Sequence, residues 1–135
     1  MYEMDKVVHF EIPAENTERA NKFYSEIFGW KIKGVNMGAP YNIVHTVEVD
    51  EKMMPKESGA INGGIFKKTE PLNAPIVIIA VSDVDEYLKK IVASGGQVAR
   101  EKRAVGDMGF VAYIKDTEGN IVGIWQEARG DWRKG

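Results

Sequence analysis

One arrangement of apolar and turn residues occurs twice in this 135-residue chain. When the sequence is shifted by 67 positions, His9 falls on Ile76 and the helix-ending Gly29 falls on Gly96. Few residues are identical between the halves, so the repeat lies in the order of the predicted elements. A period of about half the chain predicts two copies of one supersecondary unit.

Alternating apolar and polar residues predict strands, and apolar residues spaced three and four apart predict helices. The expected strands cover residues 7–12, 30–35, 41–49, 60–68, 76–81, 97–104, 109–116 and 121–126. The expected helices run from Asn16 or Thr17 to Gly29 and from Ser82 or Asp83 to Gly95. The sequence therefore predicts an α+β fold of two tandem βαβββ modules related by a pseudo-twofold repeat. They span about residues 5–70 and 74–127 of a single domain, 1–135.

A βαβββ module has a helix on one sheet face and leaves the other face uncovered. We expect the two uncovered faces to curve into a shared groove. In the first strand, Val8, Phe10 and Ile12 suit the helix face, which leaves His9 and Glu11 on the groove face. The same alternation assigns further residues to the groove: Asn62, Gly64, Phe66, Ile76, Ile78, Ala80, Ile121, Gly123 and Trp125. Tyr113 and His45 are further candidates, and the pattern does not decide which face of the sheet they occupy.

Composition excludes several kinds of function. The net charge of −2 gives no basic field for nucleic acid or an anionic membrane. The chain has no cysteine, which excludes disulfides, cysteine-ligated zinc, iron–sulfur clusters and thiol nucleophiles. Neither a signal peptide nor a membrane span is predicted, so we expect a cytoplasmic protein.

Three segments together resemble a known family. The string from His9 to Trp30 is similar to the opening of glyoxalase/bleomycin-resistance proteins, and 80–85 and 115–120 are similar to their second-half signatures. The resemblance covers about residues 6–127 and points to the vicinal oxygen chelate superfamily. That superfamily includes isomerases, dioxygenases, thiol transferases and drug-binding proteins, so the resemblance implies the fold more strongly than an activity.

The resemblance also implies where a divalent metal would be held. Metal enzymes of the superfamily use one groove-facing ligand from each of four strands, and the matching positions here are His9, Gly64, Ile76 and Gly123. Only His9 can donate a lone pair, so we expect no metal cofactor. The alternative is a rearranged site of His9, Glu11 and His45 that holds zinc, nickel, manganese or iron in a lyase, isomerase or dioxygenase.

The expected function is binding of a small hydrophobic or aromatic molecule, with or without catalysis. Glycine at 64 and 123 would widen the groove, Ile76 and Ile78 would line it, and Phe66, Tyr113 and Trp125 would stack on a ligand. His9 and Glu11 are the candidate catalytic or orienting pair. A second copy of the chain, as a homodimer, is the expected protein partner.

Structural roles remain open for the same residues. The aromatic side chains could be ordinary core, and the glycines could allow close strand packing. His9 could be a hydrogen-bonding wall residue, and His45 a core or dimer-interface residue. A third class of function, a domain used only for protein interaction, would have a groove filled by its own side chains.

Overall fold

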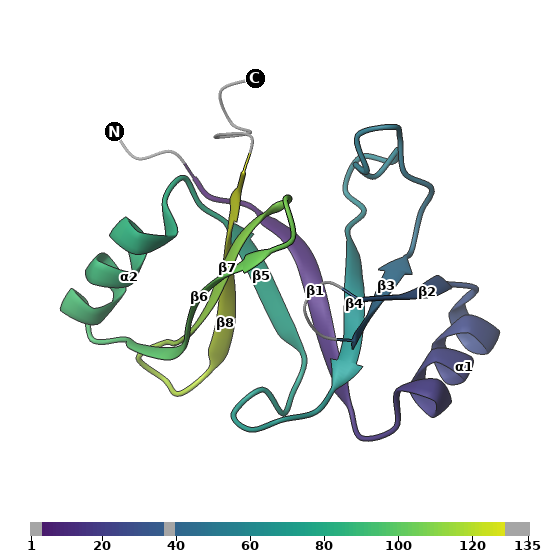
Figure 1. Ribbon diagram of the computed structural model, residues 1–135, viewed down its shortest axis with the longest axis horizontal. Coiled ribbons are helices and arrows are strands. Elements are labelled where there is room, and N and C mark those ends of the chain that lie inside the picture. Colours follow the sequence, from purple (N-terminus) through teal and green to yellow (C-terminus); the bar gives the residue numbers. More distant parts are fainter. Residues whose placement is uncertain (1–3, 37–39, 129–135) are drawn as a thin grey trace. The chain divides into compact units, whose positions relative to one another are not determined.

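The computed structural model describes residues 4–36 and 40–128. Within this range the chain divides into two compact units, which are described separately. The first unit is residues 9–75, and the second unit is residues 4–8 together with 76–128. Figure 1 follows the chain through both of them in sequence colours.

The first unit follows the order strand, helix and three strands. Its elements are β1 (Val7–Ala14, which begins two residues before the unit), α1 (Thr17–Phe28), β2 (Lys31–Asn36), β3 (Pro40–His45) and β4 (Asn62–Lys67). The strands are ordered β2-β3-β4-β1 in the sheet. β1 is parallel to β4, whereas the other neighbours are antiparallel.

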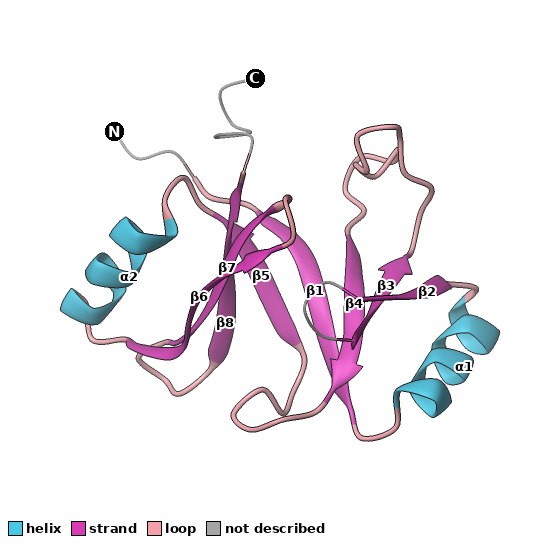
Figure 2. Cartoon of the chain, in the orientation of Figure 1, coloured by secondary structure: helices cyan, strands magenta, loops and turns pink. Residues whose placement is uncertain are grey.

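The second unit repeats that order (Figure 2). Its elements are β5 (Ile76–Ala80), α2 (Val84–Ala93), β6 (Gln97–Val105), β7 (Gly109–Lys115) and β8 (Ile121–Glu127). The strands are ordered β5-β8-β7-β6, with β5 parallel to β8. The N-terminal segment joins this unit, because the Ala80 N–H donates to the Lys6 carbonyl at 2.9 Å. The α+β class and the two βαβββ modules are confirmed.

Both helices begin at the residues that the sequence proposed as caps. The Asn16 side chain accepts a hydrogen bond from the Arg19 N–H at 2.9 Å, and the Asp83 side chain accepts one from the Glu86 N–H at 3.1 Å. α1 ends at Gly29, whose φ of 72° is the left-handed conformation that glycine adopts without steric cost. Neither helix is long and apolar enough to cross a membrane, within the residues that the structure describes.

The third strand is shorter than expected. β3 ends at His45 rather than continuing to Val49. The backbone N–H groups of Thr46 and Val47 donate to the Asn62 side-chain oxygen, at 2.7 and 3.2 Å, instead of to a neighbouring strand. The prediction of a strand over 46–49 was wrong. The alternation of apolar and polar residues does not show that the Asn62 side chain, rather than a neighbouring strand, accepts these backbone hydrogen bonds.

Each helix packs on one face of its own sheet. In the first unit the Phe10 ring lies 5.5 Å from the Trp30 ring, which stacks on Tyr24 of α1 at 5.0 Å. In the second unit, α2 residues pack with Ile79 and Ile124 around a buried cluster. Phe10 therefore lies on the helix face of β1, as expected, and Ile79 lies on the helix face of β5. His9 and Glu11 lie on the opposite face of β1, since neighbouring residues of a strand alternate in direction.

Candidate functional site

Three strands of the first unit bring polar side chains together on the face opposite α1. In the parallel pair β1 and β4, His9 is in register with Asn62, and Glu11 with Gly64. In the antiparallel pair β3 and β4, Ile43 is in register with Gly64. This register places Tyr41, two residues before Ile43, close to β1 across the small residue at position 64.

Tyr41 links Glu11 and His9 in one hydrogen-bonded chain. Its hydroxyl donates to Oε2 of Glu11 at 2.7 Å, and Nε2 of His9 lies 3.0 Å from the same hydroxyl. Glu11 is only 5% exposed. A buried carboxylate loses its hydrogen bonds to water and therefore requires donors from the protein. We refer to Glu11, Tyr41 and His9 as the polar chain.

The donors in the polar chain determine the tautomer of the imidazole. A phenol has one proton, and here it goes to the carboxylate. The phenol oxygen must then accept from His9, so Nε2 carries the hydrogen and Nδ1 carries a lone pair. Burial lowers the pKa of His9 from 6.5 to about 4, because desolvation disfavours the charged imidazolium. At neutral pH, His9 is therefore a neutral side chain with a hydrogen-bond acceptor at Nδ1.

Gly64 is covered by Tyr41. A Cβ atom built on Gly64 would overlap the hydroxyl and the ring of Tyr41. The Phe66 ring packs edge-to-face against the Tyr41 ring, at 6.3 Å and 71°. The expectation of open space at Gly64 was wrong: glycine is needed for the close approach of a side chain from β3.

Asn62 has a structural contact and one remaining donor. Its Oδ1 accepts from the backbone of Thr46 and Val47, which fixes the orientation of the amide. Its Nδ2 is buried and makes no hydrogen bond with any described residue. A buried donor in this state costs free energy unless a ligand or water molecule accepts from it.

The remaining candidate residues belong to the second unit. Ile76, Ile78 and Tyr113 are 2%, 3% and 4% exposed. A Cβ atom on Gly123 would overlap the Ile78 side chain, so the open space expected there is also filled. The Trp125 indole N–H donates to Glu127 at 2.9 Å. These contacts lie within the second unit, and they show core packing for Ile78 and Tyr113.

The residues at the four matching positions do not fit the metal site of the metal enzymes that this sequence resembles. Three of the four matching positions have no donor atom, and Tyr41 occupies the space in which a ligand at position 64 would begin. Over residues 4–36 and 40–128, no three His, Cys, Asp or Glu side chains form a group that could hold a metal. His45 stands in register with Lys31 at the far end of β3, so it does not complete a site with His9 and Glu11.

Tyr41 is the residue that sequence reasoning did not assign to the site. The alternation of β3 places it on the same face as Ile43 and His45, but alternation does not give the register between strands. The available signal was a glycine on a central strand, because such a glycine often marks the close approach of another group.

Comparison with known proteins agrees with this architecture. The sequence model of the Glyoxalase/Bleomycin resistance protein/Dioxygenase superfamily matches residues 6–124. A Mycobacterium bovis protein named "Putative glyoxylase CFP32" is 31% identical over 125 residues, which are 88% of this chain but only 44% of that protein. A "Glyoxylase-like domain-containing protein" of Didymella fabae is 31% identical over 118 residues, 84% of this chain and 88% of the relative.

Solved structures share the fold at low sequence identity. A variant of Streptomyces coelicolor methylmalonyl-CoA epimerase, in complex with 2-nitronate-propionyl-CoA, superposes with a TM-score of 0.64 and 14% identity. The match covers 93% of this chain and 99% of the epimerase chain. The match of the family model, the repeated βαβββ order and these relatives agree: this chain belongs to the Glyoxalase/Bleomycin resistance protein/Dioxygenase superfamily.

Proposed function

We propose that this chain is a metal-independent binding protein for a small aromatic or hydrophobic molecule that carries one hydroxyl group. The observation that supports this proposal is the polar chain of Glu11, Tyr41 and His9. His9 is the one residue at a matching family metal position that has a donor atom. In the polar chain its Nε2 bonds to the Tyr41 hydroxyl.

The polar chain supplies a pre-oriented acceptor. Glu11 fixes the Tyr41 hydroxyl, and that hydroxyl fixes Nε2 of His9, so the ring orientation is set before a ligand arrives. Little conformational entropy is then lost on binding, which favours affinity. Nδ1 of His9 accepts from the ligand hydroxyl.

Asn62 offers the matching donor. It is the β4 residue in register with His9, and its buried Nδ2 lacks a partner among the described residues. A hydroxyl group is both donor and acceptor, so it satisfies Nδ1 of His9 and Nδ2 of Asn62 together. The rings of Tyr41 and Phe66 supply aromatic surface for the rest of the ligand.

Binding fits the state of His9 better than general-base catalysis. A general base is most effective when its pKa lies near the working pH, and the pKa of His9 is about 4. The alternative of a metal-dependent lyase, isomerase or dioxygenase requires Nε2 of His9 or the Glu11 carboxylate as ligands. Both groups bond to Tyr41 instead.

The test uses 2-naphthol as the probe, with binding followed by the amide signals of the ¹⁵N-labelled protein. We expect saturable shifts in β1 and β4, and binding at least tenfold weaker for naphthalene and for 2-methoxynaphthalene, which cannot donate to Nδ1. His9→Ala should weaken binding of 2-naphthol, whereas His45→Ala should not. Equal binding of the three compounds would contradict the assigned hydroxyl contact.

Metal dependence is tested on the same preparation. The untagged protein is dialysed after addition of Ni²⁺, Zn²⁺, Mn²⁺ or Fe²⁺, and bound metal per chain is measured. The proposal predicts that His9 holds no metal. The amount of bound metal per chain should therefore be the same in the native protein and in His9→Ala. One equivalent of metal that is lost in His9→Ala would support the metal-dependent alternative.

A further inference from the structure

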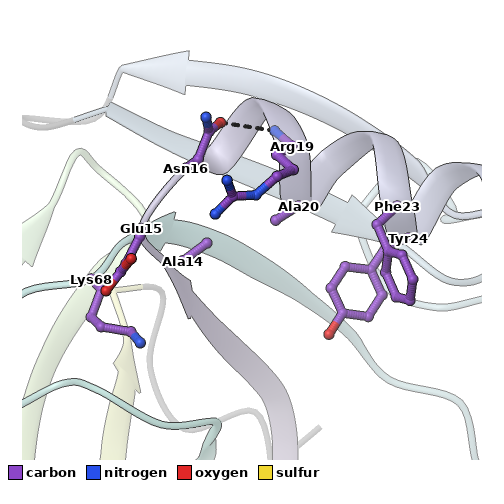
Figure 3. Close-up of a pocket in the computed structure, with 8 residues that line it drawn as sticks. All are labelled: Ala14, Glu15, Asn16, Arg19, Ala20, Phe23, Tyr24 and Lys68. Atoms are coloured by element: carbon purple, nitrogen blue, oxygen red, sulfur yellow. Dashed lines mark hydrogen bonds between the residues drawn. The ribbon is translucent and has the colours of Figure 1, made fainter.

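A second candidate site lies on the other face of the first unit. A pocket of about 580 Å³ is formed where the end of β1 and the residue after β4 approach the start of α1 (Figure 3). Its walls include Asn16, Arg19, Ala20, Phe23, Tyr24 and Lys68. None of the polar chain lines it, so this pocket is separate from the site proposed above.

The pocket has a cationic part. Arg19 and Lys68 both line it, and within the described residues neither side chain forms an ion pair. The neighbouring Lys67 is engaged, because its ammonium donates to the Glu15 backbone oxygen. Glu15 contributes one carboxylate to the wall, which leaves an excess of one positive charge.

The pocket also has an aromatic part. Figure 3 shows Phe23 and Tyr24 together at the end away from Lys68. Tyr24 is held by Trp30, with the rings parallel to within 6°, and Phe23 meets Tyr24 edge-to-face at 5.2 Å. Phe23 nevertheless remains 54% exposed. A planar group placed against it would bury apolar surface that now faces water.

The spacing of these two parts defines a ligand. Arg19 and Phe23 are four residues apart on α1, which corresponds to one turn and a rise of about 6 Å. We propose that this pocket binds a small monoanion in which a carboxylate and an aromatic ring are separated by a short spacer. The carboxylate pairs with Arg19 and Lys68, and the ring lies on Phe23. The side chain of Asn16 already caps the helix, so the cations rather than the helix end hold the anion.

The probe for this pocket is 3-phenylpropanoate, whose carboxylate and ring have about this separation. Titration into the ¹⁵N-labelled protein should shift the amides of the pocket residues, and the affinity should fall as salt is raised. The neutral 3-phenylpropanamide and the ring-free propanoate should each bind at least about fivefold more weakly. Equal binding of the amide, or shifts that map elsewhere, would overturn the proposal.

Matched variants separate the pocket from general surface charge. Arg19→Gln and Lys68→Gln should each weaken 3-phenylpropanoate about threefold, and the double variant about tenfold. Lys22→Gln removes one positive charge from an exposed position on α1 outside the pocket, so it is the control for net charge. Phe23→Ser should weaken binding, whereas Ile27→Ser, which also removes an exposed apolar side chain of α1, should not. A Lys22→Gln effect as large as that of Arg19→Gln would reject the site.

Discussion

The hydroxyl of Tyr41 occupies the space next to Gly64 in which a side chain at that position would begin. Tyr41 cannot easily move away, because its hydroxyl bonds to both Glu11 and His9. The glycine on β4 and the tyrosine on β3 therefore depend on each other, and the polar chain depends on both.

The first prediction concerns Gly64→Ala. We expect this variant to be destabilised by about 1–3 kcal/mol, because one added methyl group overlaps a ring held by two hydrogen bonds. The free energy of unfolding is measured by urea denaturation. Gly34→Ala is the matched control, since a Cβ atom there meets only Asn42 Oδ1 at an ordinary 3.5 Å.

A double variant tests whether Tyr41 causes the loss. In a Tyr41→Ala background, where the ring is absent, Gly64→Ala should cost at least about 1 kcal/mol less than in the native protein. A cost that is unchanged in this background would show that the overlap with Tyr41 is not the cause.

The second prediction concerns Tyr41→Phe. This change keeps the ring over Gly64 but removes the hydrogen bond to the buried carboxylate of Glu11. We expect a loss of about 1–3 kcal/mol in the free energy of unfolding, because a buried acceptor loses a donor. Tyr24→Phe is the control. The Tyr24 ring stacks on Trp30, and this contact does not need the hydroxyl. If the two variants are equally stable, Tyr41 is not a significant donor to Glu11.

Much of the fold could be predicted because local signals determine it. The caps at Asn16 and Asp83 and the left-handed turn at Gly29 depend only on nearby residues, and they occur where the sequence placed them. The alternation of β1 likewise gave the faces of Phe10 and His9. These features need no knowledge of which strands are neighbours.

The arrangement of the site could not be predicted to the same extent. His9 and Glu11 were identified from one strand, but Tyr41 joins them through the register of β3, β4 and β1. Register depends on long-range packing, which a single alternating strand does not encode. For the same reason, the glycines at 64 and 123 were interpreted as open space, although side chains from other strands fill both positions.

The third prediction concerns pH. The pKa of His9 is about 4 in the folded chain, against 6.5 when it is exposed, so the unfolded chain binds more protons between these values. Stability therefore rises with pH across this window and is lost as the pH falls. Between pH 7 and pH 5 we expect His9 to account for a loss of about 2 kcal/mol, measured by urea denaturation.

A variant of His9 tests this pH dependence. His9→Gln should flatten the stability profile between pH 7 and pH 5. The pKa of His9 can also be read directly from its imidazole NMR signals. A midpoint near 6.5 in the folded protein would contradict the burial of a neutral imidazole.

The last prediction concerns Asn62→Ala. The Asn62 carboxamide accepts from the backbone N–H groups of Thr46 and Val47, where the chain leaves β3. Its removal leaves those donors without this acceptor, so we expect a loss of about 1–3 kcal/mol in the free energy of unfolding and faster amide exchange at both residues.

Asn62→Asp keeps the acceptor oxygen but replaces the buried Nδ2 donor. If Nδ2 serves only as a ligand contact, Asn62→Asp should retain the slow exchange at Thr46 and Val47 and should lose affinity for 2-naphthol. Fast exchange in both variants would instead mean that the whole carboxamide is needed to hold the end of β3.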